Sequence, residues 1–321
     1  MKAAVYYETG SPDVFKYEDV PDPACPPYGV LIEVQAISVE GGDVLNRAGG
    51  EMAKRPHVVG YQCAGVVREA GADVRDRRPG DRVVATMMHG SHAALAVAPA
   101  MMTWPVPDGA RLEHVACVPV AFGTADDCLF EFGNLNAGET VLIQAGAGGV
   151  GLAAIQLAKR AGATVLATAG SADKLARLGE YGLDHGINYR TADFTQEARR
   201  LTDGKGVDLV VDSVGTTLAG SIAALAYRGR CITVGNAGRS DRRADISQLL
   251  AGNRSLRGVF LGAELAMNHA RAHPNIQRLI DDVARGALRV VVDRTFPLRE
   301  AAAAHAYIES RAPFGRVELA P

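Results

Sequence analysis

A glycine-rich turn between an apolar run and a helical pattern constrains the fold of this chain more than any other feature. Residues 146–151 read Gly-Ala-Gly-Gly-Val-Gly, which is the spacing G-x-G-x-x-G. An apolar run at 140–145 precedes the turn and is typical of a buried strand, and residues 150–161 repeat apolar side chains at helical spacing. A second apolar run follows at 164–168. The sequence therefore predicts a strand-helix-strand unit whose turn binds a dinucleotide.

Each glycine of the turn has its own physical role in such a site. Gly146 allows the tight turn, Gly148 lets the backbone approach a pyrophosphate, and Gly151 lets the helix pack closely against the strand. The N-terminus of the helix faces the anion with N–H groups that have no partner within the helix. The predicted cofactor-binding turn consists of Gly146, Gly148, Gly149, Val150 and Gly151.

The end of the second strand indicates which dinucleotide is bound. NAD sites carry an acid there, because a carboxylate accepts hydrogen bonds from the ribose 2′-hydroxyl. This chain has Ala169 at that position, followed by a hydroxyl at Ser171 and a cation at Lys174, which suit a 2′-phosphate. NADPH is therefore the favoured cofactor. The alternative is that Ser171 only caps the next helix and Lys174 is a solvated charge, although capping and phosphate contact are compatible.

The rest of the chain divides into a β-rich part and an alternating part. Short strands separated by Pro and Gly are expected up to about residue 105. After residues 107–109, strands and helices alternate, which predicts a doubly wound parallel sheet in an α/β protein. Helices at 275–285 and 300–310, each followed by a strand, are candidates to complete the first part, and 321 residues fit about two domains. The alternating part is expected to contain strands 207–212, 230–234 and 255–261 and helices 174–181 and 218–226.

Composition and charge exclude several classes of function. The chain has 34 Lys and Arg residues against 36 Asp and Glu residues, so no basic surface is expected to attract nucleic acid. Its five cysteines, without any C-x-x-C spacing, indicate neither a disulfide framework nor a zinc knuckle. No apolar run approaches the roughly 18 residues that a membrane helix needs. We therefore expect a soluble, cytoplasmic protein that acts on a small molecule.

Seven segments spread over the whole chain carry a family pattern. They are Met1-Lys-Ala-Ala-Val5, Gly65-Val-Val67, Pro79-Gly-Asp-Arg-Val83, residues 119–125, residues 145–151, Asp184-His-Gly-Ile-Asn-Tyr189 and Asp212-Ser-Val-Gly215. As a set they resemble the zeta-crystallin-like quinone oxidoreductases, the zinc-free branch of the medium-chain dehydrogenase/reductase superfamily. The resemblance implies a GroES-like β-rich substrate domain at 1–118, completed by 262–321, and a Rossmann NADP-binding domain at 119–261.

The resemblance also implies positions for residues around the cofactor. Tyr189 is expected to join Ser171 and Lys174 near the 2′-phosphate. A homodimer is implied as well, through the sheet edge within residues 231–260. The residues implied near the nicotinamide are Thr124, Gly235, Phe260 and Leu261.

The two positions that hold a catalytic metal in zinc-dependent relatives are altered here. Those relatives use a Cys from a C-G-x-D motif and a His from a G-H-E motif. The matching positions are Glu40 and Tyr61, so no metal is predicted, and His89 and His92 are interpreted as ordinary polar positions. Without a Lewis acid, a substrate accepts hydride with help from hydrogen bonds alone. This selects quinones and alkenes conjugated to a carbonyl.

Four side chains are candidates for the chemistry: Glu40, Asp43, Arg47 and Tyr61. The family commonly has Asn at position 40, and partial burial of a carboxyl there raises its pKa. Glu40 is then either a proton donor to the substrate or the partner of Arg47 or another cation. Tyr61 offers a phenol that orients the substrate carbonyl. If Asp126 shares a pocket with Glu40 and Asp43, the three acids disfavour an anionic substrate.

The sequence thus supports three functions. The leading prediction is an NADPH-dependent, zinc-independent reductase that transfers hydride to a quinone or a carbonyl-activated alkene. A pathway-specific enone or enoyl-thioester reductase of natural-product metabolism is the second, because the pocket residues depart from the family pattern. The third is an NADPH-binding protein with incidental redox activity. Turnover of an enone or quinone separates the first two from the third.

Overall fold

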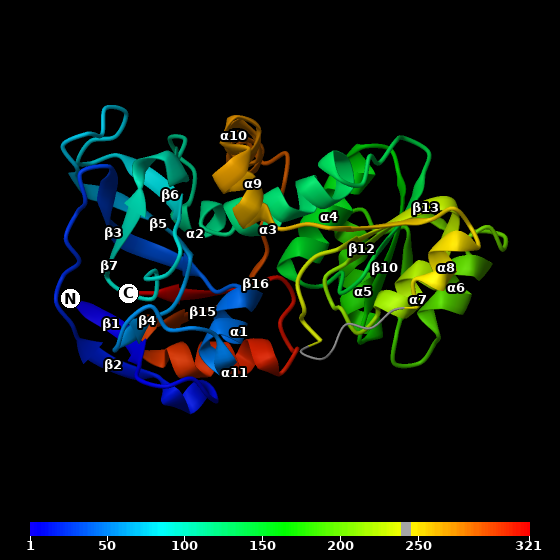
Figure 1. The fold of residues 1–321 in the computed structure, drawn as a ribbon, viewed down its shortest axis with the longest axis horizontal. Helices are drawn as coiled ribbons and strands as arrows, with labels where there is room; N and C mark the ends of the chain where they lie inside the picture. Colours follow the sequence, from blue (N-terminus) through cyan, green and yellow to red (C-terminus); the bar gives the residue numbers. More distant parts are fainter. Residues whose placement is uncertain (239–244) are drawn as a thin grey trace. The chain divides into compact units, whose positions relative to one another are not determined.

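The computed structural model describes residues 1–238 and 245–321, which form two compact units (Figure 1). Unit 1 consists of residues 1–120 and 265–321, and unit 2 consists of residues 121–264. The boundaries expected from the sequence are 118/119 and 261/262, and the function expected of each domain stays a prediction. None of the helices in the described residues has the length and apolar character needed to cross a membrane.

Unit 2 contains a six-stranded sheet in which neighbouring strands run parallel. The strands are β9 (Thr140–Ile143), β10 (Thr164–Ala169), β11 (His185–Asn188), β12 (Val207–Asp212), β13 (Leu225–Thr233) and β14 (Ser255–Gly258). Their order is β11-β10-β9-β12-β13-β14, so strands are added in opposite directions on the two sides of β9. This is the doubly wound Rossmann arrangement, and it confirms the predicted parallel sheet. Ligands of such sheets bind at the carboxyl ends of the strands, where the order reverses.

Helices connect these parallel strands. They are α4 (Gly149–Arg160), α5 (Ala172–Leu178), α6 (Phe194–Arg200), α7 (Leu218–Ala223) and α8 (Ser247–Leu250). Helix α4 buries Leu152, Ile155 and Ala158, the positions whose spacing predicts it. The predicted helix at 218–226 ends at Ala223 because β13 already begins at Leu225. Strand β11 was not predicted, since only Ile187 of its four residues is buried and no apolar pattern marks it.

Unit 1 contains two sheets. Strands β2 (Lys16–Asp19), β1 (Lys2–Tyr6) and β4 (His57–Val58) form a small sheet in that order. The larger sheet has the order β15 (Val292–Pro297), β16 (Arg316–Ala320), β3 (Gly29–Ser38), β5 (Gln62–Ala70), β6 (Arg82–Thr86) and β8 (Thr103–Pro105), and β7 (Leu95–Pro99) also pairs with β3. Leu319 of β16 lies opposite Ile37 of β3 in an antiparallel ladder. Late strands therefore complete a sheet that begins early in the chain, as the sequence suggested.

The helices of unit 1 position its polar side chains. They include α1 (Gly41–Gly49), α2 (Leu112–Val115), α10 (His269–Ala284) and α11 (Ala301–Glu309), while α3 (Val118–Asp126) and α9 (Leu261–Met267) contain the points at which the units divide. Helix α1 was not predicted, because its glycines indicate a turn. Its N-terminus is capped by Asp43, whose carboxylate accepts a hydrogen bond from the N–H of Glu40 at 2.8 Å.

Helix α11 packs on the larger sheet and carries one member of a buried histidine pair. Ala301 and Ala304 belong to the same core cluster as Cys63, a fully buried small side chain. His305 lies with its Nε2 3.1 Å from Nε2 of His92, and both side chains are fully buried. Burial lowers the pKa of His92 to about 3 and lowers that of His305 well below its ordinary value. Both rings are therefore neutral in the folded protein near pH 7.

This pair makes the stability of unit 1 sensitive to acid. Below pH 6.5 the unfolded chain binds protons at both histidines and the folded chain does not, so the free energy of unfolding falls as the pH drops. Each histidine contributes about 1.4 kcal/mol per pH unit once it titrates fully. Urea unfolding followed by the fluorescence of Trp104, the single tryptophan, measures this between pH 7 and 4. His305→Gln reduces the slope, whereas the same change at exposed His185 leaves it unaltered; equal slopes for wild type and His305→Gln would contradict the assignment.

Candidate functional site

The glycine-rich turn joins β9 to α4 at the carboxyl edge of the unit 2 sheet. Gly146 donates its N–H to the carbonyl of Thr168 in β10 at 2.8 Å. Ala145 before it has φ +52°, a left-handed conformation that L-residues rarely adopt. A Cβ at Gly151 would lie 2.4 Å from the carbonyl oxygen of Ala145, so the start of α4 approaches the turn more closely than any side chain permits. The predicted packing role of Gly151 is thus visible in the structure.

The backbone in front of α4 is open enough for a pyrophosphate. Gly148 is the N-cap of this 12-residue helix and is exposed, and a Cβ there would meet only the carbonyl of Ala145, at 3.4 Å. Gly149 and Val150 form the first turn, where the N–H groups have no partner within the helix. Exposed N–H groups at a helix N-terminus are the donor set that a phosphate needs. The residues therefore fit a dinucleotide.

The turn rests on a buried polar network at the ends of three strands. The hydroxyl of Thr168 donates to the side-chain oxygen of Gln144 at 2.8 Å and accepts the N–H of Ala145 at 3.1 Å. Gln144 donates to the hydroxyl of Ser221 at 3.2 Å, and Ser221 donates to Asp212 at 2.7 Å. The side chains of this network are buried. β9, β10 and β12 are thus tied together directly beneath the turn.

The end of β10 carries a group of polar side chains suited to a 2′-phosphate. Ser171 caps α5 by accepting the N–H of Lys174 at 3.3 Å, so the predicted capping role is present. Tyr189 is 44% exposed, and its hydroxyl would lie 2.8 Å from a Cβ at Gly170. The Nε of Arg190 would lie 3.3 Å from the same Cβ, so a guanidinium belongs to this group as well. Arg190 is not among the predicted residues, although it directly follows Tyr189, the last residue of the family motif.

The residues predicted near the nicotinamide lie at several places in unit 2 and α9. Gly235 follows β13 with φ +76°, and the neighbouring loops after β12 and β13 are joined by a hydrogen bond from Gly238 to Val214 at 2.8 Å. Phe260 is 75% exposed after β14, whereas Leu261 and Thr124 are buried. Contact of these residues with a nicotinamide stays a prediction.

In unit 1, Glu40 is buried at the start of α1 in a polar cluster. Its Oε1 accepts hydrogen bonds from the hydroxyl of Ser38 at 2.9 Å and the amide of Gln62 at 3.1 Å. The same oxygen pairs with the guanidinium of Arg316 in β16. Gln62 in turn accepts the N–H of Val120, the last residue before the chain enters unit 2. The ion-pair alternative for Glu40 is therefore the one the structure contains, and its cation is Arg316.

Asp43 and Tyr61 lie in the same cluster. Burial raises the pKa of the Glu40 carboxyl, while Arg316 and Ser38 oppose that rise. Burial also raises the pKa of Asp43 well above its ordinary value, and the neighbouring Glu40 carboxylate adds to the rise. The phenol of Tyr61 has a raised pKa because of burial first and of the two acids second, so it stays protonated at neutral pH.

The phenol of Tyr61 packs against the first turn of α1. A Cβ at Gly42 would lie 2.6 Å from the Tyr61 hydroxyl, so a side chain at position 42 would displace the ring. The two positions that resemble zinc-ligand positions, 40 and 61, are thus close together in one unit. Asp126 belongs to unit 2, and a pocket shared with Glu40 and Asp43 stays a prediction.

Arg47 does not pair with Glu40. It pairs with Glu309 of α11 and donates to the carbonyl of Gly10, and its side chain is 1% exposed. These contacts join α1 to α11 and to the loop after β1. The structure therefore gives Arg47 a role in holding α1, and brings Arg316 to Glu40 in its place. Residues 316–319 alternate polar and apolar side chains, as an ordinary strand does. This pattern does not distinguish Arg316 from a surface residue of the strand.

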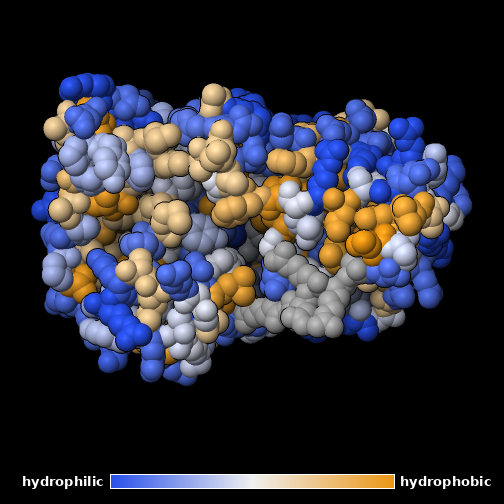
Figure 2. Space-filling view, viewed as in Figure 1, coloured by the Kyte–Doolittle hydropathy of each residue, from blue (hydrophilic) through white to orange (hydrophobic). Residues whose placement is uncertain are grey.

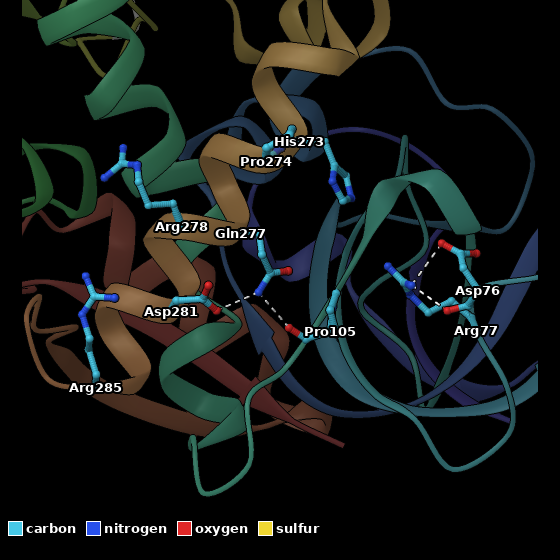
Figure 3. A pocket seen from close by; sticks show the side chains of 9 residues that line it. All are labelled: Asp76, Arg77, Pro105, His273, Pro274, Gln277, Arg278, Asp281 and Arg285. Carbon is cyan, nitrogen blue, oxygen red and sulfur yellow. Dashed lines mark hydrogen bonds and ion pairs between the residues drawn. The ribbon is translucent and has the colours of Figure 1, made fainter.

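A surface hollow of unit 1 contains none of the predicted site residues (Figure 3). Arg77 on its wall is bonded to Thr103 and Asp76, and Gln277 of α10 donates to Asp281 and to the carbonyl of Pro105. Most of these polar groups are paired with one another, although the side-chain oxygen of Gln277 has no partner among the described residues, and we assign no chemistry to the hollow. Over residues 1–238 and 245–321, no three His, Cys, Asp or Glu side chains are grouped so as to hold a metal ion.

Known proteins share this fold over the whole chain. Residues 26–108 match the alcohol dehydrogenase GroES-like domain, and residues 149–279 match the zinc-binding dehydrogenase family. The chain is 35% identical to a 2-haloacrylate reductase from Burkholderia sp, with 100% of this chain and 99% of that protein covered.

Two solved structures extend the comparison. The quinone oxidoreductase of Escherichia coli complexed with NADPH superposes with a TM-score of 0.94 at 28% identity, with 100% of both chains covered. A mycobacterial protein complexed with NADPH gives 0.94 at 33% identity, again with 100% of both chains covered. Fold and site define a medium-chain dehydrogenase/reductase. Within that superfamily the chain belongs to the zeta-crystallin-like quinone oxidoreductases, the zinc-free branch, which confirms the resemblance seen in the sequence.

Proposed function

We propose that this protein is an NADPH-dependent reductase that delivers hydride to a quinone or to a carbonyl-activated alkene without zinc. The observation that carries the proposal is the end of β10, where Tyr189 and Arg190 lie beside Gly170, Ser171 and Lys174 begin α5, and Ala169 replaces the acid of NAD sites. The relatives support it, since two of the solved structures contain NADPH and the 2-haloacrylate reductase is named for an alkene substrate.

Residues of unit 2 would bind the cofactor along the carboxyl edge of the sheet. The N–H groups of Gly149 and Val150 would donate to the pyrophosphate, and the group at the end of β10 would hold the 2′-phosphate. When bound, NADPH supplies a hydride from C4 of its nicotinamide. The residues proposed near that ring are Thr124, Gly235, Phe260 and Leu261.

Residues of unit 1 would prepare the substrate. Because three donors converge on Oε1 of Glu40, this carboxylate accepts hydrogen bonds and is a poor proton source. The protonated phenol of Tyr61 is the better donor to a developing oxyanion. A guanidinium beside Glu40 also disfavours a second cation at the position that zinc occupies in relatives. We therefore propose that Tyr61 orients the carbonyl and that Glu40 shapes the site.

Cofactor choice tests the proposal. Lys174→Ala combined with Arg190→Ala raises KM for NADPH tenfold or more and changes KM for NADH by less than about twofold, because charged hydrogen bonds of roughly 1.5–3 kcal/mol each are lost only with the phosphate. The measurement is absorbance at 340 nm with a panel of quinones, short enones and enoyl thioesters. Lys205→Ala, an exposed lysine of the same unit, is the matched control.

Other outcomes of this measurement have definite meanings. Equal changes in KM for both cofactors would reject the 2′-phosphate site at the end of β10. If the wild type binds NADPH and turns over no member of the panel, the protein is a cofactor-binding protein and the reductase proposal fails. Turnover restricted to enoyl thioesters would favour the pathway-specific reductase.

The role of Tyr61 makes a separate prediction. Tyr61→Phe lowers kcat about 10- to 100-fold because the oxyanion loses a hydrogen bond, while KM for NADPH is unchanged. The change keeps the aromatic ring that packs on Gly42, so the melting temperature stays within a few degrees. Tyr28→Phe, at a tyrosine that is 64% exposed in the same unit, serves as the control. An unaltered kcat in Tyr61→Phe would remove Tyr61 from the chemistry.

We also propose a homodimer that pairs two copies along β14. Within the described residues β14 pairs only with β13, so its outer edge has no strand partner. Tyr227, Ile246 and Leu250 are 70%, 70% and 82% exposed, and Figure 2 shows hydrophobic side chains gathered around α8 and β14. Residues 239–244, part of the predicted contact region, lie outside the described residues.

The oligomeric state is directly measurable. Sedimentation equilibrium is expected to give twice the chain mass of 33.7 kDa. Leu250→Asp shifts the mass toward that of the monomer because a charge would be buried in the contact. Met88→Asp, at an 89% exposed methionine of unit 1, leaves the dimer intact. A wild-type mass of 33.7 kDa at micromolar concentration would exclude the dimer.

We also propose a cytoplasmic location, on the evidence of the cysteines. All five cysteines are unpaired, and four of them are buried. Burial raises the pKa of the Cys63 thiol to about 12, so this thiol is inert. Such a set of free thiols suits a reducing compartment, and titration of fewer than five thiols in the denatured protein without reductant would argue against it.

A further inference from the structure

Arg316 is a buried cation for which the proposed chemistry has no use. Its Nη2 donates to the hydroxyl of Ser38 at 2.6 Å and to the carbonyl of Val39 at 3.0 Å, and pairs with Glu40. Its Nε donates to the same hydroxyl at 3.2 Å. Nη1 donates to no residue in 1–238 or 245–321. It is also not one of the atoms that are fully buried and unpaired. Nη1 therefore keeps contact with solvent, as the 10% exposure of the side chain allows.

Glu40 covers only part of this guanidinium. The hydrogen bonds that Ser38, Gln62 and Arg316 donate to its carboxylate all end on Oε1, and the carboxylate also accepts the N–H of Asp43 in the capping box of α1. A carboxylate that faced Arg316 fully would contact two N–H groups in the bidentate geometry that guanidinium favours. Glu40 leaves one edge of Arg316 open and neutralises its charge.

Among residues 1–238 and 245–321, no other acid forms an ion pair with Arg316. Glu318, the next residue of β16 on the same face, is held through Oε1 by the Cys117 thiol at 3.4 Å and through Oε2 by Thr295 at 3.2 Å. Burial raises the pKa of Glu318 to about 7, so near neutral pH it is only partly charged. Asp43, the remaining acid of the cluster, has a pKa raised well above its ordinary value by burial. Glu40 is thus the residue on which the neutrality of the site depends.

We propose that Glu40 masks Arg316 and thereby sets the substrate class: neutral quinones, enones and alkene amides are accepted, and alkenes that carry a free carboxylate are excluded. The proposal rests on the proposed reductase function. Glu40 occupies the guanidinium edge that a substrate carboxylate would need, and its own negative charge repels that carboxylate. Removal of the Glu40 charge exposes a buried cation beside Tyr61, which is the arrangement that binds a carboxylate.

A substrate pair of equal shape and different charge tests the proposal. The pair is a 2-alkenoate and its primary amide, and each variant is compared with wild type through the ratio of the two kcat/KM values, so the intrinsic reactivity of the substrates cancels. Glu40→Gln raises the alkenoate-to-amide ratio at least tenfold, mainly by lowering KM for the alkenoate. Glu40→Asp retains the charge and the wild-type ratio. Glu33→Gln, at an exposed glutamate of β3, makes the same charge change away from the cluster and leaves the ratio unchanged.

Further variants decide whether Arg316 is the cation responsible. Glu40→Gln combined with Arg316→Gln loses the gain, because the exposed guanidinium is gone. A gain that persists in this double variant, or an unchanged ratio in folded Glu40→Gln, overturns the proposal. If Glu40→Gln does not fold, inhibition of the wild type tests the proposal instead. The alkenoate is expected to inhibit reduction of a neutral substrate at least tenfold more weakly than the amide does. Equal inhibition by the two compounds overturns the proposal. A wild type that reduces no neutral substrate refutes the reductase function itself, which is a separate outcome.

Discussion

The nucleotide end of this protein depends on one buried chain of hydrogen bonds, from Asp212 through Ser221 and Gln144 to Thr168. Each of these polar groups would cost about 1–3 kcal/mol if it were buried without a partner. The chain is satisfied only when β9, β10 and β12 keep their register, so it fixes the strand ends at the point where the strand order reverses. Ala145, which has a left-handed backbone conformation, donates its N–H to Thr168 of this network. The network thereby fixes the shape of the glycine-rich turn.

A second buried polar cluster gives unit 1 its chemical character. The two positions that resemble zinc-ligand positions hold a carboxylate and a phenol, and a buried carboxylate needs a cation. Arg316 provides it from β16, a strand far along the chain from Glu40. The change at position 40 and the cation at position 316 therefore belong together physically. Tyr61, beside both, keeps its proton and is the group able to donate.

The sequence predicts the parts of the structure that follow periodic patterns or close backbone contacts. The spacing of Gly146, Gly148 and Gly151 predicts the turn, and the apolar runs predict the parallel sheet around it. Helix α1 is not predicted because the glycines within residues 41–49 indicate a turn. The contact that stabilises its N-terminus is the hydrogen bond from the N–H of Glu40 to the Asp43 side chain. The pairing of Glu40 with Arg316 escapes because its two residues meet only through the antiparallel ladder of β16 with β3. Contacts between distant strands leave no local signal.

The pairing of β16 with β3 also determines the order in which the two units can fold as the chain is synthesised. Unit 2 is continuous in sequence, so all its strands have emerged before β15 and β16 are synthesised. The nucleotide turn and its network can form while the sheet of unit 1 still lacks two of its strands. During that interval Glu40 has no guanidinium beside it. The fold thus separates a part that is assembled early from a part whose charge balance is reached only when the strand carrying Arg316 docks.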